Sequence, residues 1–457
     1  MSVSLLLQRR LVLAVLATIL ASFLGSSTQA SDWPMWRYDA QRSGATPTEL
    51  PATLQLQWRR DLPAPRPAWP EDPRLLFDAT YEPVVAGQLM YVASAQTDSV
   101  AAYDTQSGKP RWQFFTDGPI RFAPVVVEDT VMFGADDGFF YCLDGNSGKL
   151  RWKFNAAPSG RRALGNDRLV SIWPVRGGAV LSDGKVHFTA GVWPFEGSYL
   201  YSFDAKAAAA ANAPPKPNMT LLPQKSPQGY LVSNGPQVFI PSGRDAAMWM
   251  HHASGTSLFL QYAARHLSDY HVTISGKWLL HGDQVVAYGD SAVTEFTLRR
   301  PVTADSLMYG AKDGAIVAHD LNDSKIVDAK YPDGRAYKLR HFAERWQIPA
   351  DQFAAALKNA GIQVNPESLL EVNLCAGQRL YGHWGSNLFA VDMPQDGGEA
   401  RVSWTHQIEG EPASMLAADD RLFVTNRQGH IFCFADGNAA ATVTSPSTPA
   451  LAATALD

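Results

Sequence analysis

The chain has 457 residues, a net charge of −5 and 46% hydrophobic residues. Its length allows a large buried core, and its mild acidity gives no reason to expect a nucleic-acid partner, which would require a basic patch or stripe. Three cysteines exclude a disulfide scaffold, and the absence of a Cys-x-x-Cys-His motif excludes covalent haem attachment.

The first 30 residues have the pattern of a secretory signal peptide. Arg9 and Arg10 precede an apolar run at residues 11–24, and Thr28-Gln29-Ala30 offers a small-x-small cleavage site. The alternative is an uncleaved membrane anchor, for which this run is short. We therefore expect a periplasmic or secreted protein that is cleaved after Ala30 and has no transmembrane span.

A repeat with a period of 40 residues comes next. The stretch AAYDTQSGKPRWQFF at residues 101–115 returns as YCLDGNSGKLRWKFN at residues 141–155. Each copy predicts a strand, a tight turn and a second strand, because Gly adopts positive φ and Asp or Ser bonds its nearby backbone. A fixed period of this size indicates a repeat architecture.

Taken in chain order, eight such units of short β-rich runs and turn signals are predicted. They cover residues 83–114, 124–154, 179–204, 230–261, 271–298, 301–327, 372–404 and 413–437. An orphan copy of the Trp-bearing strand stands at residues 54–62, and the last unit stops without one. Pairing these two would close a ring and protect its edge. We predict an all-β, eight-bladed β-propeller over residues 31–437, with seven blades as the alternative.

Other segments depart from the repeat. Residues 328–371 are predicted as a helical insertion, with helices at 337–347 and 349–359. Residues 438–457 are rich in Ala, Thr, Ser and Pro and are predicted to be a disordered tail.

The pattern Ala-x-Asp-x-x-Ser/Thr-Gly-x-x-x-Trp resembles the repeat of the pyrroloquinoline-quinone (PQQ)-like propellers. That superfamily includes quinoprotein dehydrogenases and the lipoprotein of the outer-membrane barrel assembly machinery. The resemblance covers nearly the whole mature chain. It implies tryptophans that pack between neighbouring blades, a structural role that falls here to Trp58, Trp112, Trp152 and Trp404.

Two functions fit this resemblance. A PQQ-dependent oxidoreductase of alcohols or sugars would need a quinone pocket in the channel and a calcium site of Glu, Asn and Asp, often with a vicinal Cys-Cys pair. The chain has no adjacent cysteines and no motif that assigns a catalytic residue or a metal site. We therefore expect a non-catalytic binding or scaffold module of the cell envelope, without a cofactor; the PQQ- and calcium-dependent enzyme is the alternative.

The most unusual stretch is residues 161–178, within the long interblade connection at residues 155–178. Arg suits bidentate binding of carboxylate or phosphate, and loops on rigid scaffolds carry function. The loop is therefore predicted to bind an envelope protein or an anionic ligand at the channel mouth; the alternative is a solvated loop whose arginines cap carbonyl groups. The predicted binding residues are Arg161, Arg162, Arg168, Trp173 and Arg176, joined by Arg121 and Arg244.

Overall fold

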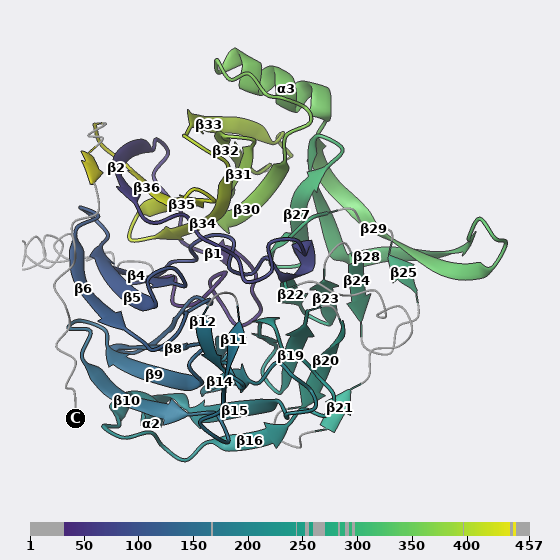
Figure 1. Ribbon diagram of the computed structural model, residues 1–457. Coiled ribbons are helices and arrows are strands. Elements are labelled where there is room, and N and C mark those ends of the chain that lie inside the picture. Colours follow the sequence, from purple (N-terminus) through teal and green to yellow (C-terminus); the bar gives the residue numbers. More distant parts are fainter. Residues whose placement is uncertain are drawn as a thin grey trace, which may run out of the picture.

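The computed structural model describes residues 32–438 and 442–444, apart from residues 166–167, 244, 252–255, 259–269, 282–283, 288–291, 295–297, 396 and 439–441. The predicted signal peptide, Arg244 and most of the predicted tail lie outside these residues. Eight sheets of three to five strands surround a central axis and form the predicted eight-bladed β-propeller (Figure 1). Neither α-helix in the described part is long and apolar enough to cross a bilayer.

The first four blades follow the predicted units closely. Both faces of their inner strands are buried because each blade packs between two others; the four consecutive residues 140–143 of the second blade are at most 4% exposed. The strands of these blades are β3 (Val84–Ala86), β4 (Leu89–Ser94), β5 (Ser99–Asp104) and β6 (Pro110–Phe115); β7 (Val125–Val127), β8 (Thr130–Gly134), β9 (Phe139–Asp144) and β10 (Leu150–Asn155); β13 (Gly177–Ser182), β14 (Lys185–Ala190), β15 (Tyr199–Asp204), β16 (Asn218–Leu221) and β17 (Gly229–Tyr230); β18 (Val232–Ser233), β19 (Gln237–Ser242), β20 (Asp245–His251) and β21 (Thr256–Leu258).

The last four blades complete the ring. Two short elements lie outside the blades: the hairpin β11 (Arg162–Gly165) and β12 (Arg168–Ser171), and helix α2 (Ala205–Ala210). The strands of the last four blades are β22 (Val272–Ser275), β23 (Trp278–His281) and β24 (Gln284–Ala287); β25 (Val293–Thr294), β26 (Val302–Ala304), β27 (Leu307–Lys312), β28 (Ala315–Lys330) and β29 (Ala336–Ile348); β1 (Ala45–Thr46), β30 (Leu370–Ala376), β31 (Arg379–Trp384), β32 (Asn387–Asp392) and β33 (Arg401–Gln407); β34 (Pro412–Ala418), β35 (Arg421–Asn426), β36 (His430–Ala435), β2 (Gln55–Asp61) and β37 (Thr442–Thr444).

The orphan Trp-bearing strand closes the ring, as the sequence predicted. Strand β2 pairs antiparallel with β36 of the last blade and places Trp58 opposite Cys433. Strand β37 then adds in parallel outside β2. The prediction that all of residues 438–457 are disordered was therefore wrong for Thr442–Thr444, which find a partner only once the ring has closed.

The predicted insertion contains one helix rather than two. Helix α3 (Ala350–Asn359) forms as predicted and buries Phe353 and Leu357, one turn apart. Residues 337–347 were predicted helical but belong to strand β29, which forms a long ribbon with β28 that projects from the ring (Figure 1). Leu339 and Phe342 are three residues apart, a spacing that suits one face of a helix, and both are buried. They lie instead in a strand whose pairing with β28 is interrupted by shifts in register.

The axis of the propeller is filled by the N-terminal residues 32–46, which we call the axial segment. It runs along the inner strands of successive blades, from Trp33 paired with Val85 to Gly44 O accepting from Cys375 N at 2.9 Å. Figure 1 shows this part of the chain, in dark purple, crossing the centre of the ring. The blade repeats predicted nothing for this segment.

A second segment, the cap loop at residues 62–82, covers one end of the axis. It leaves the last blade at Leu62, whose N–H donates to Gly429 O at 3.0 Å, and re-enters the ring at the first blade. Between these points Phe77 stacks on Phe122 with ring centroids 4.7 Å apart, and Trp69 Nε1 donates to Gln228 Oε1 at 3.1 Å. The cap loop thus contacts blades at both ends of the ring.

Candidate functional site

The four tryptophans assigned to blade packing each reach the next blade. Their indole N–H groups donate to backbone carbonyl oxygens across the interface, at 2.8 to 3.0 Å. The pairs are Trp58 with Thr105, Trp112 with Gly145, Trp152 with Ala208, and Trp404 with Leu54.

The glycine of the repeat's Ser-Gly turn packs against the tryptophan of the neighbouring blade. Gly148 has a φ of +71°, and a Cβ there would lie 2.5 Å from the Trp112 ring; Gly108 faces Trp58 in the same way. Sequence analysis missed a fifth equivalent, Trp346, which pairs with Ala318 in the register that Trp112 has with Ala102. The predicted helix at residues 337–347 concealed it.

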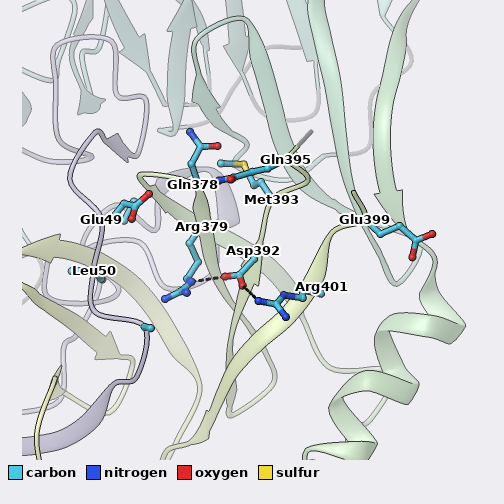
Figure 2. A pocket seen from close by; sticks show the side chains of 11 residues that line it. Glu49, Leu50, Gln378, Arg379, Asp392, Met393, Gln395, Glu399 and Arg401 are labelled. Carbon is cyan, nitrogen blue, oxygen red and sulfur yellow. Dashed lines mark hydrogen bonds and ion pairs between the residues drawn. The ribbon is translucent and has the colours of Figure 1, made fainter. Parts of the chain in front are cut away.

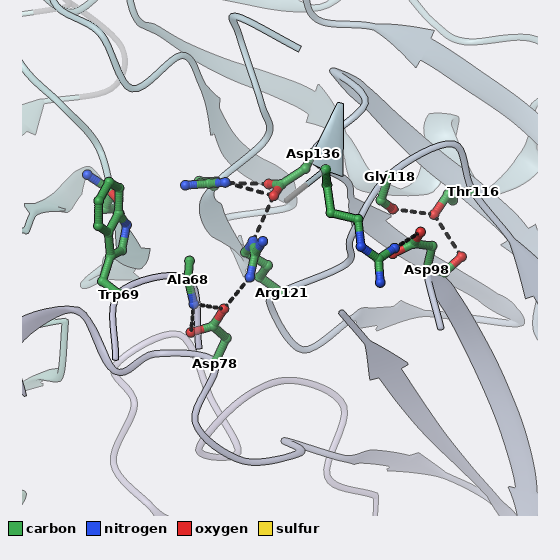
Figure 3. A network of polar contacts seen from close by, with 11 residues as sticks. Ala68, Trp69, Asp78, Asp98, Thr116, Gly118, Arg121 and Asp136 are labelled. Atoms are coloured by element: carbon green, nitrogen blue, oxygen red, sulfur yellow. Dashed lines mark hydrogen bonds and ion pairs between the residues drawn. The ribbon is translucent and has the colours of Figure 1, made fainter. Parts of the chain in front are cut away.

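The predicted binding arginines lie in different environments. Arg121 and Arg176 are buried and both bind Asp136: Arg176 Nε and Nη2 lie 2.9 and 2.8 Å from its two oxygens, and Arg121 Nε lies 2.7 Å from one of them. Arg121 also reaches Asp78 of the cap loop at 2.5 Å (Figure 3). This pair of arginines therefore ties the cap loop to the blades.

Electrostatics agree with a structural role for this network. Burial alone would raise the pKa of Asp136, but the two guanidinium groups outweigh it and hold the pKa below its usual value. The pKa of Arg121 is raised, because its two carboxylate partners outweigh its own desolvation. A buried cation held by two carboxylates is not available to a ligand.

The remaining described loop residues lie on hairpin β11–β12 or directly beside it. Arg161 forms two contacts with Glu196, at 2.8 and 2.9 Å, and Trp173 is buried with its indole N–H donating to Glu196 O at 3.0 Å. Arg168 binds the Asp98 carboxylate and Gln96 O. Arg162 is exposed. Arg161 thus joins the hairpin to the neighbouring loop at residues 191–198. The remaining predicted residue, Arg244, lies outside the described residues.

Sequence analysis missed the exposed apolar side chains at this corner of the face. Leu164 and Leu169 form a cross-strand pair on the hairpin and are 81% and 55% exposed. Phe195, next to the Glu196 that holds Arg161, is 83% exposed. Exposed apolar side chains that gather into one patch mark interaction sites. The turn signal Asn166-Asp167 between Leu164 and Leu169 could have predicted the hairpin.

Side chains of the axial segment pack against the inner strands at the axis. Trp36 of the axial segment stacks on Tyr230 with ring centroids 3.9 Å apart, and Arg42 is fully buried with its guanidinium bound to Leu231 O, Trp36 O and Ala179 O at 2.8 to 2.9 Å. These contacts hold the axial segment in place. In the described part of the chain, no group of three or more His, Cys, Asp or Glu side chains is placed to hold a metal ion.

A cavity of about 410 Å³ lies beside the seventh blade (Figure 2). Three of its charged side chains form ion pairs with one another: Asp392 lies 2.7 Å from Arg379 and 3.2 Å from Arg401. Burial opposes ionisation of Asp392, but hydrogen bonds from Ser403 and Arg379 hold its pKa below the usual value. Asp392 occupies the turn position of the repeat, so these contacts stabilise the turn.

Comparisons with known proteins agree with this fold. Residues 50–180 match the family model described as outer membrane protein assembly factor BamB. No curated protein matches the chain.

Three solved structures resemble it at low sequence identity. A quinohemoprotein alcohol dehydrogenase from Comamonas testosteroni has a TM-score of 0.55 and 12% identity, over 92% of this chain and 82% of that chain. A europium-containing methanol dehydrogenase has a TM-score of 0.51 and 12% identity, over 89% of this chain and 98% of that chain. The computationally designed Ika8 protein has a TM-score of 0.52 and 10% identity, over 84% and 100%. At these identities the likeness concerns the fold.

The closed ring, the tryptophan contacts between blades and these comparisons define an eight-bladed β-propeller. Within it, residues 50–180 resemble the family of PQQ-like repeat propellers.

Proposed function

We propose that this protein is an exported, non-catalytic binding module of the cell envelope. One observation carries the proposal: the chain's own axial segment and cap loop occupy the axis, where a quinone enzyme of this family would need its pocket. The family model matched by residues 50–180 carries the description of an outer-membrane assembly factor. The apolar run at residues 11–24 and the small residue Ala30 support export.

The binding surface is the corner of the face built by hairpin β11–β12 and the loop at residues 191–198. Leu164, Leu169 and Phe195 supply exposed apolar anchors, and Arg162 adds a charge at the rim. Interfaces of proteins combine an apolar centre with a polar rim in this way. The partner that this surface fits is an envelope protein with an apolar patch bordered by acidic groups.

A photo-crosslinking experiment on isolated envelopes tests the binding role. Wild-type protein should form a discrete crosslinked product through a probe placed at the exposed position 162, and the double variant Leu164→Ser/Leu169→Ser should lose that product. Because both leucines are exposed, the variant should unfold at the wild-type temperature. A variant that forms the same product in the same amount would place the surface elsewhere.

A redox assay tests the alternative. The purified protein, supplied with PQQ and calcium, should show no alcohol- or sugar-dependent reduction of an electron-accepting dye. Turnover that saturates with substrate would overturn the non-catalytic proposal in favour of the oxidoreductase.

A further inference from the structure

The outer rim of the third blade has a strand with one unpaired edge. Strand β16 pairs with β15 along its whole length, from Leu221 opposite Tyr199 to Asn218 opposite Ser202, and it is the last strand of its sheet. Figure 1 shows β16 on the outside of the ring. An unpaired edge presents backbone N–H and C=O groups that can bind another strand.

This edge carries exposed apolar side chains and no charge. Met219 and Leu221 are 59% and 56% exposed, and no residue of β16 is charged. The outer strands β6, β10 and β33 each carry at least one arginine, whereas the shorter outer strands β21, β24, β25 and β37 also carry no charge. Natural edge strands are normally blocked by charged side chains, so an edge with two exposed large apolar residues is open to pairing.

The chain around β16 is also basic. Residues 205–243 contain Lys206, Lys216 and Lys225 but no Asp or Glu, although the whole protein has a net charge of −5. A partner with acidic side chains would be attracted to this rim and would gain on-rate and specificity from it.

Strand addition is already used elsewhere in this fold. Strand β37 adds in parallel to β2, β25 to β29 and β1 to β30, each from a segment distant in sequence. Three other sheets of the ring therefore receive a short extra strand, whereas nothing in the described part of the chain pairs with the outer edge of β16.

We propose that the outer edge of β16 is a strand-addition site for an extended segment of a partner protein with alternating apolar and acidic side chains. Main-chain hydrogen bonds would provide affinity, Met219 and Leu221 would contact the apolar side chains, and the lysines would favour the acidic ones. The inference deepens the proposed binding function and rests on it, but it uses a surface separate from hairpin β11–β12.

Fluorescence polarisation with the full mature chain tests this site. The probe is a labelled ten-residue peptide of alternating valine and glutamate; the controls replace glutamate with lysine or N-methylate alternate amides. We expect the valine–glutamate peptide alone to bind, more weakly at higher ionic strength. Met219→Glu/Leu221→Glu should weaken binding about tenfold or more, and Lys216→Glu should weaken it in the same direction. The matched variant Phe115→Glu, on the outer strand of the first blade, should bind as wild type does.

Three results would overturn the site: no binding of the valine–glutamate peptide, equal binding of its N-methylated form, or unchanged binding by the folded double variant. None of these touches the crosslink at hairpin β11–β12, so the rim site can fail while the proposed function stands. Conversely, the variant Leu164→Ser/Leu169→Ser could keep the crosslinked product while the peptide still binds the wild-type protein. That result would reject the hairpin surface and leave the rim site standing.

Discussion

The contact between a tryptophan and a glycine sets the spacing between neighbouring blades. The Trp112 ring lies against Gly148, and its N–H reaches Gly145 O in the same turn at 2.8 Å. A side chain at position 148 would clash with the Trp112 ring. The glycine of the repeat thus has two roles, a positive φ in the turn and room for the tryptophan of the blade before it.

Two alanine variants separate these roles. Gly148→Ala and Gly184→Ala both place a Cβ at a φ near +70°, but nothing lies within 4 Å of a Cβ at position 184. Both should lose about 1 kcal/mol to backbone strain, and Gly148→Ala should lose about 1–3 kcal/mol more through overpacking. Urea unfolding measures both values. Equal losses would contradict the packing role.

At the scale of the element, strand β2 makes the ring a closed structure. It comes from the start of the folded chain and pairs with β36 from its end, so a strand from the N-terminal part of the chain completes the last blade. Trp58 anchors the strand: it is 1% exposed, and its indole N–H donates to Thr105 O of the first blade at 3.0 Å. One side chain therefore joins the two ends of the ring.

Truncating this anchor should loosen the closure. Trp58→Ala should lower the free energy of unfolding by about 3–5 kcal/mol, the usual loss for a buried aromatic ring. Phe115→Ala, at a site 43% exposed on the first blade's outer strand, is the matched control and should cost far less. Thermal and urea unfolding, followed by circular dichroism, give the comparison. A Trp58→Ala protein as stable as the control would rule out closure through this residue.

At the scale of the whole molecule, the axial segment, the cap loop and the last blade meet at one carboxyl group. Glu82, at the end of the cap loop, accepts from Ser414 Oγ at 2.6 Å and interacts electrostatically with Arg37 of the axial segment. Burial raises its pKa to about 7, although Ser414, Arg300 and Arg37 act against that rise. Its protonation is therefore coupled to the contact between three distant parts of the chain.

The sign of the resulting pH dependence follows from linkage. Glu82 binds a proton in the folded protein up to about pH 7 but only to about 4.5 in the unfolded chain, so its contribution to stability is lost as pH rises through that window. His383 acts oppositely: burial lowers its pKa to about 4, so its contribution is lost as pH falls from 6.5.

The pH ranges in which Glu82 and His383 affect stability overlap. A variant that removes only the Glu82 carboxyl group therefore isolates its contribution. Between about pH 5 and about pH 8 the wild-type protein should lose more unfolding free energy than Glu82→Gln does, because only the wild type must ionise a buried carboxyl group. Urea unfolding at the two pH values measures both slopes. Parallel slopes would show that Glu82 does not titrate in this window.

The repeat architecture was determined by the sequence alone because its signals are local. The period of 40 residues, the Asp-x-x-Ser-Gly turns and the Trp-bearing strands each depend on neighbours within a few residues. Ring closure was also predictable, since a spare strand at residues 54–62 and an unfinished last unit can be counted in the chain.

Tertiary structure decided the features that depend on partners distant in sequence. The axial segment has no repeat pattern and acquires its conformation from inner strands up to the seventh blade. Strand β29 has apolar spacing that also suits a helix, and only its pairing with β28 selects the strand. Arg121 and Arg162 look alike in the sequence, yet the fold surrounds one with Asp78 and Asp136 and leaves the other in solvent. The sequence specifies the charge and type of each residue. Whether a residue is buried, and so serves packing or is free to bind, depends on how the blades assemble.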